Sequence, residues 1–226
     1  MTFTASERRV IRQCRTPASV QQFLNALPYN TEPPPDPATL RSFRGVVRHR
    51  TANCIEAALS AAVILEQHGY PPLVMSLESI DQLDHVIFVY RHRGRWGSVA
   101  RSRDLGLHGR RPVFSTPRHL ARSYFDPFVD FTGRLKAYAL VDLRVLGTYD
   151  WRLSERNVWK VETYLLNVPH RPIASSDARV RRLRARYVAF RKAHPGMQPD
   201  YYDQRTWTEL PNLRNPSNRS NPSNPN

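Results

Sequence analysis

The chain has 226 residues, of which 40% are hydrophobic, and it carries a formal net charge of +15 at pH 7. This composition is typical of a globular protein with one substantial core, and no stretch approaches the roughly 18 apolar residues that span a membrane. The N-terminus lacks the apolar segment of a secretory signal, and two cysteines, Cys14 and Cys54, make neither a disulfide framework nor a CxxC zinc motif, so we expect a soluble, cytoplasmic protein.

The N-terminal third is predicted to be helical. Two helices are expected over 17–27 and 38–47, and the proline-rich connector LPYNTEPPPDP between them excludes helix. A longer helix begins at Cys54, because Asn53 is a preferred N-cap residue and Glu56 stands at the capping-box position. After Cys54 this helix is apolar nearly all round, so we expect it to be buried on most sides.

An antiparallel meander is predicted after this helix, from segments rich in Val, Ile, Phe and Tyr. The expected strands span 72–77, 84–90, 95–102 and 134–143. The later helices are expected over 115–125, 155–167 and 177–194. The first of these has Thr116 as its cap and Pro117 at its first position.

These elements predict an α+β protein in which a central helix packs on an antiparallel sheet. We divide it into an N-terminal helical segment with its connector (1–36), a central core (37–150), a C-terminal helical extension (151–209) and a tail (210–226). The tail has no hydrophobic pattern and is expected to be disordered.

The excess positive charge lies in several arginine-rich segments, of which 178–192 is the longest. In that segment Val180, Leu183, Tyr187 and Phe190 recur at helical spacing, which is typical of a helix that docks one face and solvates the other. A basic surface also favours acidic partners such as nucleic acid, anionic lipid or acidic proteins, although no known nucleic-acid motif is present.

Cys54 is the candidate nucleophile. A thiol at the first turn of a helix meets backbone N–H groups without intrahelical partners and the positive end of the helix dipole, so its pKa is expected to fall below the ordinary value. The same N–H groups can hold an oxyanion. The alternative is that Cys54 is a small core residue, as most free cysteines are.

His85 is the candidate base, because it opens an apolar strand whereas the other histidines lie in turns, basic runs or beside proline. Alternation places it on the face of Ile87 and Val89, and a helix packed on that face could reach it. If Arg91 pairs with Trp96, His85 falls opposite Ser102 with Asp104 diagonal to it. Asp104 is therefore the third candidate, with Ser102 as the fallback; a loop one residue longer would place neither there.

These residues resemble a known family. NCIEAAL at a helix start, followed by LDHVIFVY and RWGSVARSRDLGLHGRRPVF, is similar to the bacterial transglutaminase-like branch of the papain-like cysteine fold, and LPYN at 27–30 fits the same pattern. The resemblance implies Cys54 as nucleophile, His85 as its partner and Asp104 as the third member. The family's aspartate usually follows a tryptophan closely in a D-P-T context, whereas Trp96 here precedes GSVARSRD.

The resulting hypothesis is a cysteine hydrolase or acyltransferase that acts at an amide or ester carbonyl of a peptide, protein or small molecule without a metal or other cofactor. The residues do not separate hydrolysis from transfer. The alternative hypothesis is a non-catalytic module on the same fold that binds polyanions, nucleic acid included, through its arginine-rich surface.

Overall fold

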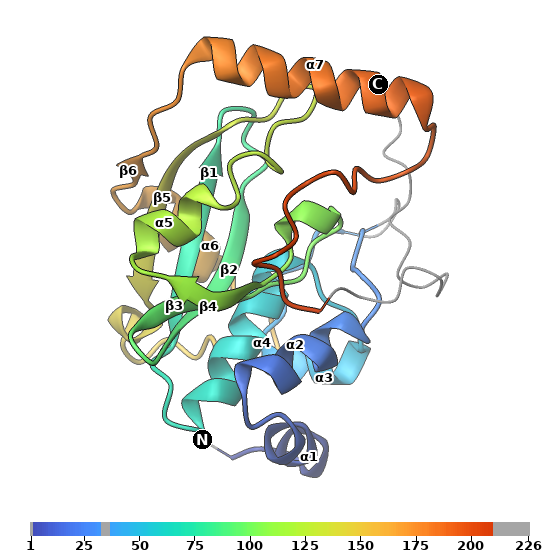
Figure 1. Cartoon of the computed structure of the whole chain (residues 1–226). Coiled ribbons are helices and arrows are strands. Elements are labelled where there is room, and N and C mark those ends of the chain that lie inside the picture. Colours follow the sequence, from blue (N-terminus) through green and yellow to red (C-terminus); the bar gives the residue numbers. More distant parts are fainter. Residues whose placement is uncertain (1, 33–36, 210–226) are drawn as a thin grey trace.

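The computed structural model describes residues 2–32 and 37–209 (Figure 1). Its helices are α1 (Ala5–Gln13), α2 (Pro17–Asn25), α3 (Phe43–His49), α4 (Cys54–Glu66), α5 (Pro117–Arg122), α6 (Trp159–Asn167) and α7 (Asp177–Ala193). Its strands are β1 (Leu73–Ser79), β2 (His85–His92), β3 (Arg95–Val99), β4 (Arg110–Phe114), β5 (Leu135–Asp142) and β6 (Arg171–Pro172), and two 3-10 helices are η1 (Leu105–Leu107) and η2 (Leu143–Leu146). The predicted disorder of 210–226 lies outside the described residues.

The α+β class is confirmed: six antiparallel strands form one sheet in the order β4-β3-β2-β1-β5-β6. Of the two registers that the sequence left open, the structure has the one in which Arg91 pairs with Trp96 and His92 with Arg95. Arg93 and Gly94 both have positive φ, as the tightest hairpin turns require.

Helix α1 and strands β4 and β6 were not predicted from the sequence. Helix α1 is polar, and its only buried acidic residue, Glu7, is held by an ion pair with Arg44 at 2.7 Å. Strand β4 carries a proline and a fully buried arginine, Arg110, which no hydrophobic pattern would indicate. Conversely, the strand predicted over 95–102 is shorter in the structure, where β3 ends at Val99.

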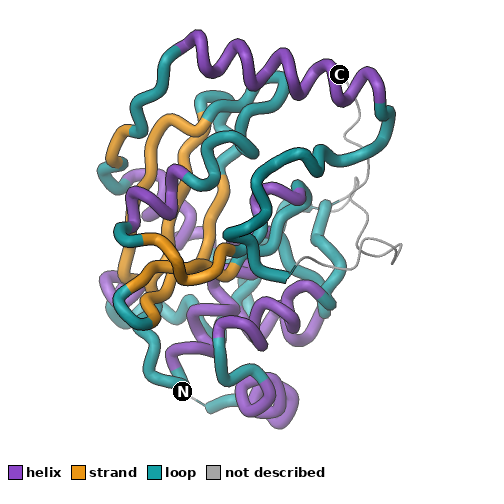
Figure 2. The backbone as a smooth tube through the Cα atoms, in the orientation of Figure 1, coloured by secondary structure: helices purple, strands orange, loops and turns teal. Residues whose placement is uncertain are grey.

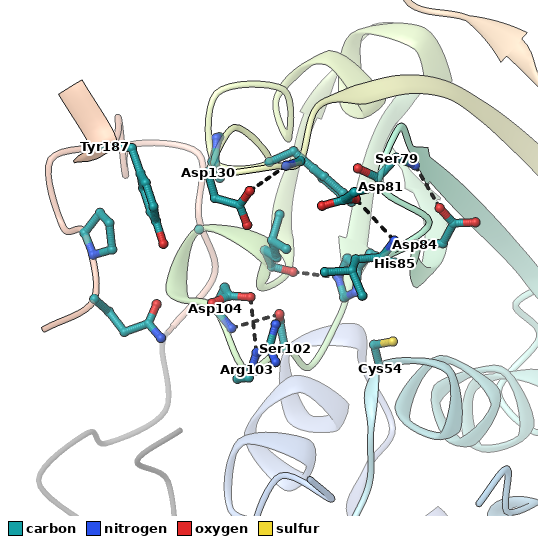
Figure 3. Close-up of a pocket in the computed structure, with 18 of the residues that line it drawn as sticks. Cys54, Ser79, Asp81, Asp84, His85, Ser102, Arg103, Asp104, Asp130 and Tyr187 are labelled. Carbon is teal, nitrogen blue, oxygen red and sulfur yellow. Dashed lines mark hydrogen bonds and ion pairs between the residues drawn. The ribbon is translucent and has the colours of Figure 1, made fainter. Parts of the chain in front are cut away.

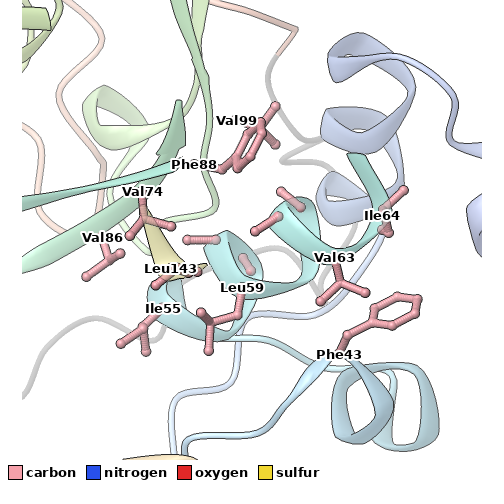
Figure 4. Packing of buried hydrophobic residues seen from close by; sticks show 14 of the residues in the cluster. Phe43, Ile55, Leu59, Val63, Ile64, Val74, Val86, Phe88, Val99 and Leu143 are labelled. Carbon is pink, nitrogen blue, oxygen red and sulfur yellow. The ribbon is translucent and has the colours of Figure 1, made fainter. Parts of the chain in front are cut away.

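Helix α4 is the centre of the fold. Every residue from Ile55 to Leu65 is buried, and the helix packs between the sheet and helices α1, α2 and α3 (Figures 2 and 4). The strand side chains in contact with this layer include Val86 and Phe88. The expectation that α4 covers the Ile87 and Val89 face is therefore wrong; those two side chains belong to the second core. Both faces of β2 are apolar, so alternation alone did not select between them.

The second core lies on the other face of the sheet, beneath α5, the segment that follows it and α7 (Figure 1). Helix α7 docks through Val180 and Tyr187, which are buried, as its spacing predicted. Among the described residues, no helix is both long and apolar enough to cross a membrane.

The N-terminus of α4 is locked by a buried carboxylate. The predicted capping box is present: the Asn53 side chain accepts from the Glu56 N–H, and the Glu56 carboxylate accepts from the Asn53 N–H at 3.0 Å. The same carboxylate, fully buried, accepts from the Thr39 hydroxyl and the Arg41 N–H, each at 2.9 Å. Glu56 thus joins the chain before α3 to the first turn of α4, where Cys54 stands.

We expect Glu56→Ala to lower the free energy of unfolding by about 2–4 kcal/mol, because it leaves several buried donors without an acceptor. Urea denaturation measures the change. Glu155→Ala is the control, since Glu155 is exposed and pairs with Arg48 at the surface, which is worth less than about 1 kcal/mol. Equal losses in the two variants would contradict this account of the cap.

Candidate active site

A cavity of about 240 Å³ opens where the first turn of α4 meets the start of β2 (Figure 3). Cys54 and His85 both line it, and so do Asp104 and Ser102. The fold therefore brings all four residues selected from the sequence to one cavity, although they come from three separate segments.

The Cys54 thiol lies among hydrogen-bond donors. The groups that favour the Cys54 thiolate are the backbone N–H groups of Val86 and Ile55 and the Tyr29 hydroxyl. Val86 directly follows His85, so the thiol sits against the strand that carries the candidate base. Burial raises the pKa of the Tyr29 hydroxyl, and the Cys54 N–H acts on it in the opposite direction.

The pKa of the Cys54 thiol is nevertheless raised, because burial disfavours the thiolate more than these donors favour it. The predicted lowering of this pKa by the helix terminus is therefore wrong. The resting thiol is protonated at neutral pH.

His85 is buried, whereas Cys54 is half-buried, and the imidazole is uncharged at neutral pH. Burial and the nearby charge of Arg110 lower its pKa to about 4, despite a hydrogen bond to the Leu107 carbonyl that acts in the opposite direction. The distance from Nε2 to that carbonyl oxygen is 2.9 Å. A carbonyl only accepts, so Nε2 carries the proton and Nδ1 is left as the basic nitrogen.

The position expected for the third residue is occupied by a backbone group. Within the described residues, the ring hydrogen bond of His85 goes to Leu107 rather than to Asp104 or Ser102. Asp104 accepts the Leu107 N–H at its own carbonyl, at 3.1 Å, and its carboxylate lies 3.6 Å from Arg103. Asp104 thus closes the turn that presents the Leu107 carbonyl, and Ser102 braces that turn by accepting the Asp104 N–H at 3.0 Å.

Two participants were missed as site residues. Leu107 acts through its carbonyl, which no side-chain pattern reveals. Tyr29 lies in the LPYN segment, and a short parallel bridge to Ala52 places it beside the start of α4. The only sequence signal for Tyr29 was the likeness of that segment to the family.

The cavity is acidic although the protein is strongly basic. Its charged lining residues are Asp81, Asp84, Asp104, Asp130 and, as the one arginine of the described lining, Arg103. Burial raises the pKa of Asp84, whose carboxylate accepts from the Ser79 N–H at 2.8 Å. The excess of carboxylates makes this cavity unsuited to a polyanion.

Comparisons with known proteins leave the family open. No family model and no curated protein sequence matches this chain. Among solved structures, it is similar to LapG of Legionella pneumophila with a TM-score of 0.37 and 13% identity, over 66% of this chain and 88% of that one. So distant a similarity supports no conclusion about activity, and the site is argued from its own geometry.

We expect alkylation of Cys54 by iodoacetamide to be slow at neutral pH and to reach half its maximal rate above pH 9.0, the ordinary value from which burial raises the pKa. The thiolate is the reacting species, so the rate follows its fraction. Mass spectrometry separates this reaction from that of Cys14. A midpoint below about 7.5, in the range of activated thiols, would contradict the assigned resting state.

We also expect acid to destabilise the fold through His85. Below pH 6.5 the unfolded chain binds a proton that the folded chain refuses until about pH 4, so the free energy of unfolding falls as the pH falls between these values. The slope from this residue is at most about 1.4 kcal/mol per pH unit.

Urea denaturation at several pH values tests this slope. It should become shallower in His85→Gln and stay unchanged in His92→Gln, a matched change at an exposed site. Buried His108, whose pKa is also lowered, adds to the slope in every variant. An unchanged slope in His85→Gln would refute the assignment.

Proposed function

We propose that this chain is a cysteine hydrolase or acyltransferase with a papain-like, transglutaminase-like core that acts at an amide or ester carbonyl. The observation that carries the proposal is the meeting of Cys54 and neutral His85 in one cavity, with the Cys54 sulfur against the N–H of the residue after His85. The family likeness of the sequence segments agrees with it.

The protonation states define the first chemical step. The thiol is protonated and the imidazole is neutral, so His85 acts as a general base during attack rather than as the cation of a preformed ion pair. The Cys54 sulfur bonds to the carbonyl carbon while its proton passes to His85 Nδ1. The Nε2 hydrogen bond to Leu107 holds the tautomer that leaves Nδ1 basic.

The carbonyl oxygen becomes an oxyanion. The Cys54 backbone N–H is a donor for it, and in the resting structure the nearby Tyr29 oxygen is the group that this N–H acts on. The substrate oxygen therefore takes the place of the phenol oxygen, and the Tyr29 hydroxyl becomes free to donate as well. In this proposal the Tyr29 oxygen lies at the oxyanion position in the resting enzyme, and the Tyr29 hydroxyl is the second donor to the oxyanion once substrate binds.

Collapse of the intermediate breaks the C–N or C–O bond, and His85 gives its proton to the leaving group. The product is a thioester on Cys54. Water or an amine then attacks the thioester while His85 takes the proton of that nucleophile. The C–S bond breaks, and His85 passes the proton to the sulfur, which restores the thiol and the neutral imidazole. The choice between water and amine decides between hydrolysis and transfer.

The polyanion-binding alternative is less well supported. The cavity is acidic, and several arginines of α7 are bound within the fold: Arg179 pairs with Asp126, and Arg184 donates to the Asp130 and Gly133 carbonyls. The remaining basic surface can still attract an acidic partner. A nucleic-acid affinity that falls steeply with salt, without Cys54 acylation, would favour this alternative.

The test is acylation of Cys54 by p-nitrophenyl acetate. We expect a burst of p-nitrophenolate and a thioester on Cys54, located by mass spectrometry of the intact and digested protein. His85→Ala should slow the acylation by about 10²–10⁴-fold, the usual contribution of a general base. Asp104→Asn keeps the backbone carbonyl that holds the Leu107 turn, so it should leave the acylation rate close to that of wild type.

Cys54→Ala is expected to abolish the burst, and Cys14→Ala to retain it, since Cys14 is buried away from the cavity. The proposal is refuted if folded wild-type protein forms no acyl adduct at Cys54, or if His85→Ala acylates as fast as wild type.

A further inference from the structure

The chain after α7 turns back across the molecule toward β4, as the dark red segment of Figure 1 shows. We call residues 198–209 the C-terminal strap. Three residues of the strap, Gln198, Pro199 and Tyr202, line the same cavity as Cys54, together with Tyr187 of α7. In Figure 3, Tyr187 lies at the opposite end of the cavity from Cys54.

The strap is attached to β4 through its backbone. The Arg111 N–H donates to the Thr206 carbonyl at 2.8 Å, and the Thr208 N–H donates to the Gly109 carbonyl at 3.1 Å. These bonds flank an antiparallel bridge between Arg110 and Trp207. The strap therefore extends the edge of the sheet by a short pairing.

A buried side-chain contact reinforces this pairing. The Arg110 guanidinium carbon lies 4.1 Å from the centre of the Tyr124 ring and 5.1 Å from that of Trp207, and both Arg110 and Trp207 are buried. Such cation–π contacts strengthen when they are removed from water. At the end of the strap, the Asn25 side chain donates to the Glu209 carbonyl at 2.8 Å.

The strap also packs tightly at the cavity. The centres of the Tyr202 and Trp207 rings lie 6.4 Å apart, so Trp207, which pairs with β4, supports Tyr202, which lines the cavity. A Cβ on Gly106 would lie 3.3 Å from the Tyr202 ring, which shows how closely the strap passes over η1. Tyr202 is therefore a fixed part of the cavity.

We propose that the strap is a size-limiting wall of the active site, with Tyr202 as the specificity-determining residue and Trp207 as its anchor. The cavity of about 240 Å³ is smaller than the roughly 300–1,000 Å³ of most ligand pockets. The cavity suits a small acyl compound or the terminus of a peptide chain, and the strap excludes the middle of an extended polypeptide. The acyl part of this statement rests on the proposed function; the size limit does not.

The test measures access to Cys54 with two reagents of the same chemistry and different size, N-methylmaleimide and N-(1-pyrenyl)maleimide, at one mildly alkaline pH. Mass spectrometry identifies the modified cysteine. Wild-type protein should prefer the small reagent strongly at Cys54. Tyr202→Ala and Trp207→Ala should each reduce that preference by about tenfold, because truncation opens space that the fold only partly refills.

Arg205→Ala is the matched control, because Arg205 lies in the strap but is exposed and pairs only locally with Asp203. It should leave the preference unchanged. Circular dichroism confirms that each variant is folded.

The proposal is overturned if folded Tyr202→Ala and Trp207→Ala keep the wild-type preference, including the case in which both reagents react faster by the same factor. It is also overturned if neither reagent modifies Cys54 in wild type. If the variants change the size preference but Cys54 forms no acyl adduct, the proposal that the strap limits size stands and the proposed function is refuted.

Discussion

The burial of α4 is the constraint on which the rest of the structure depends. A helix that is apolar on every side must be covered on every side, so the sheet takes one flank and the N-terminal helices take the others. Its polar N-terminus is then the part that reaches the cavity. The buried Glu56 carboxylate satisfies the donors there and holds the first turn in place. A rigid, fully packed helix thus positions Cys54.

The same burial determines the resting chemistry of the site. Desolvation disfavours both the thiolate of Cys54 and the imidazolium of His85, and it outweighs the hydrogen bonds and helix terminus that favour the thiolate. A neutral pair avoids two buried charges in the absence of substrate. In the proposed reaction, charge separation occurs only during attack, when the oxyanion and the protonated histidine form together near fixed donors.

The charge distribution divides the molecule between a basic exterior and an acidic cavity. Some of the arginines form contacts within the fold. Arg110 joins the strap to Tyr124, and Arg184 binds the loop that contributes Asp130 to the cavity. The C-terminal extension therefore does more than cover the second core. Through α7 and the strap it completes the cavity that the core residues begin.

Local sequence was sufficient to predict the capping box at Asn53 and Glu56 and the buried faces of α4 and α7, and it limited the hairpin to two registers, of which the structure has the Arg91–Trp96 one. Each of these depends on residues close in the chain or on strong periodicity. Other features became known only from the tertiary structure. These are the sheet face that α4 covers, the Leu107 partner of His85, the position of Tyr29 beside Cys54 and the strap at the cavity. They depend on backbone carbonyls, on two equally apolar strand faces and on pairings across long chain separations. The sign of the Cys54 pKa shift belongs with them, because desolvation is a property of the packed fold and not of any local sequence.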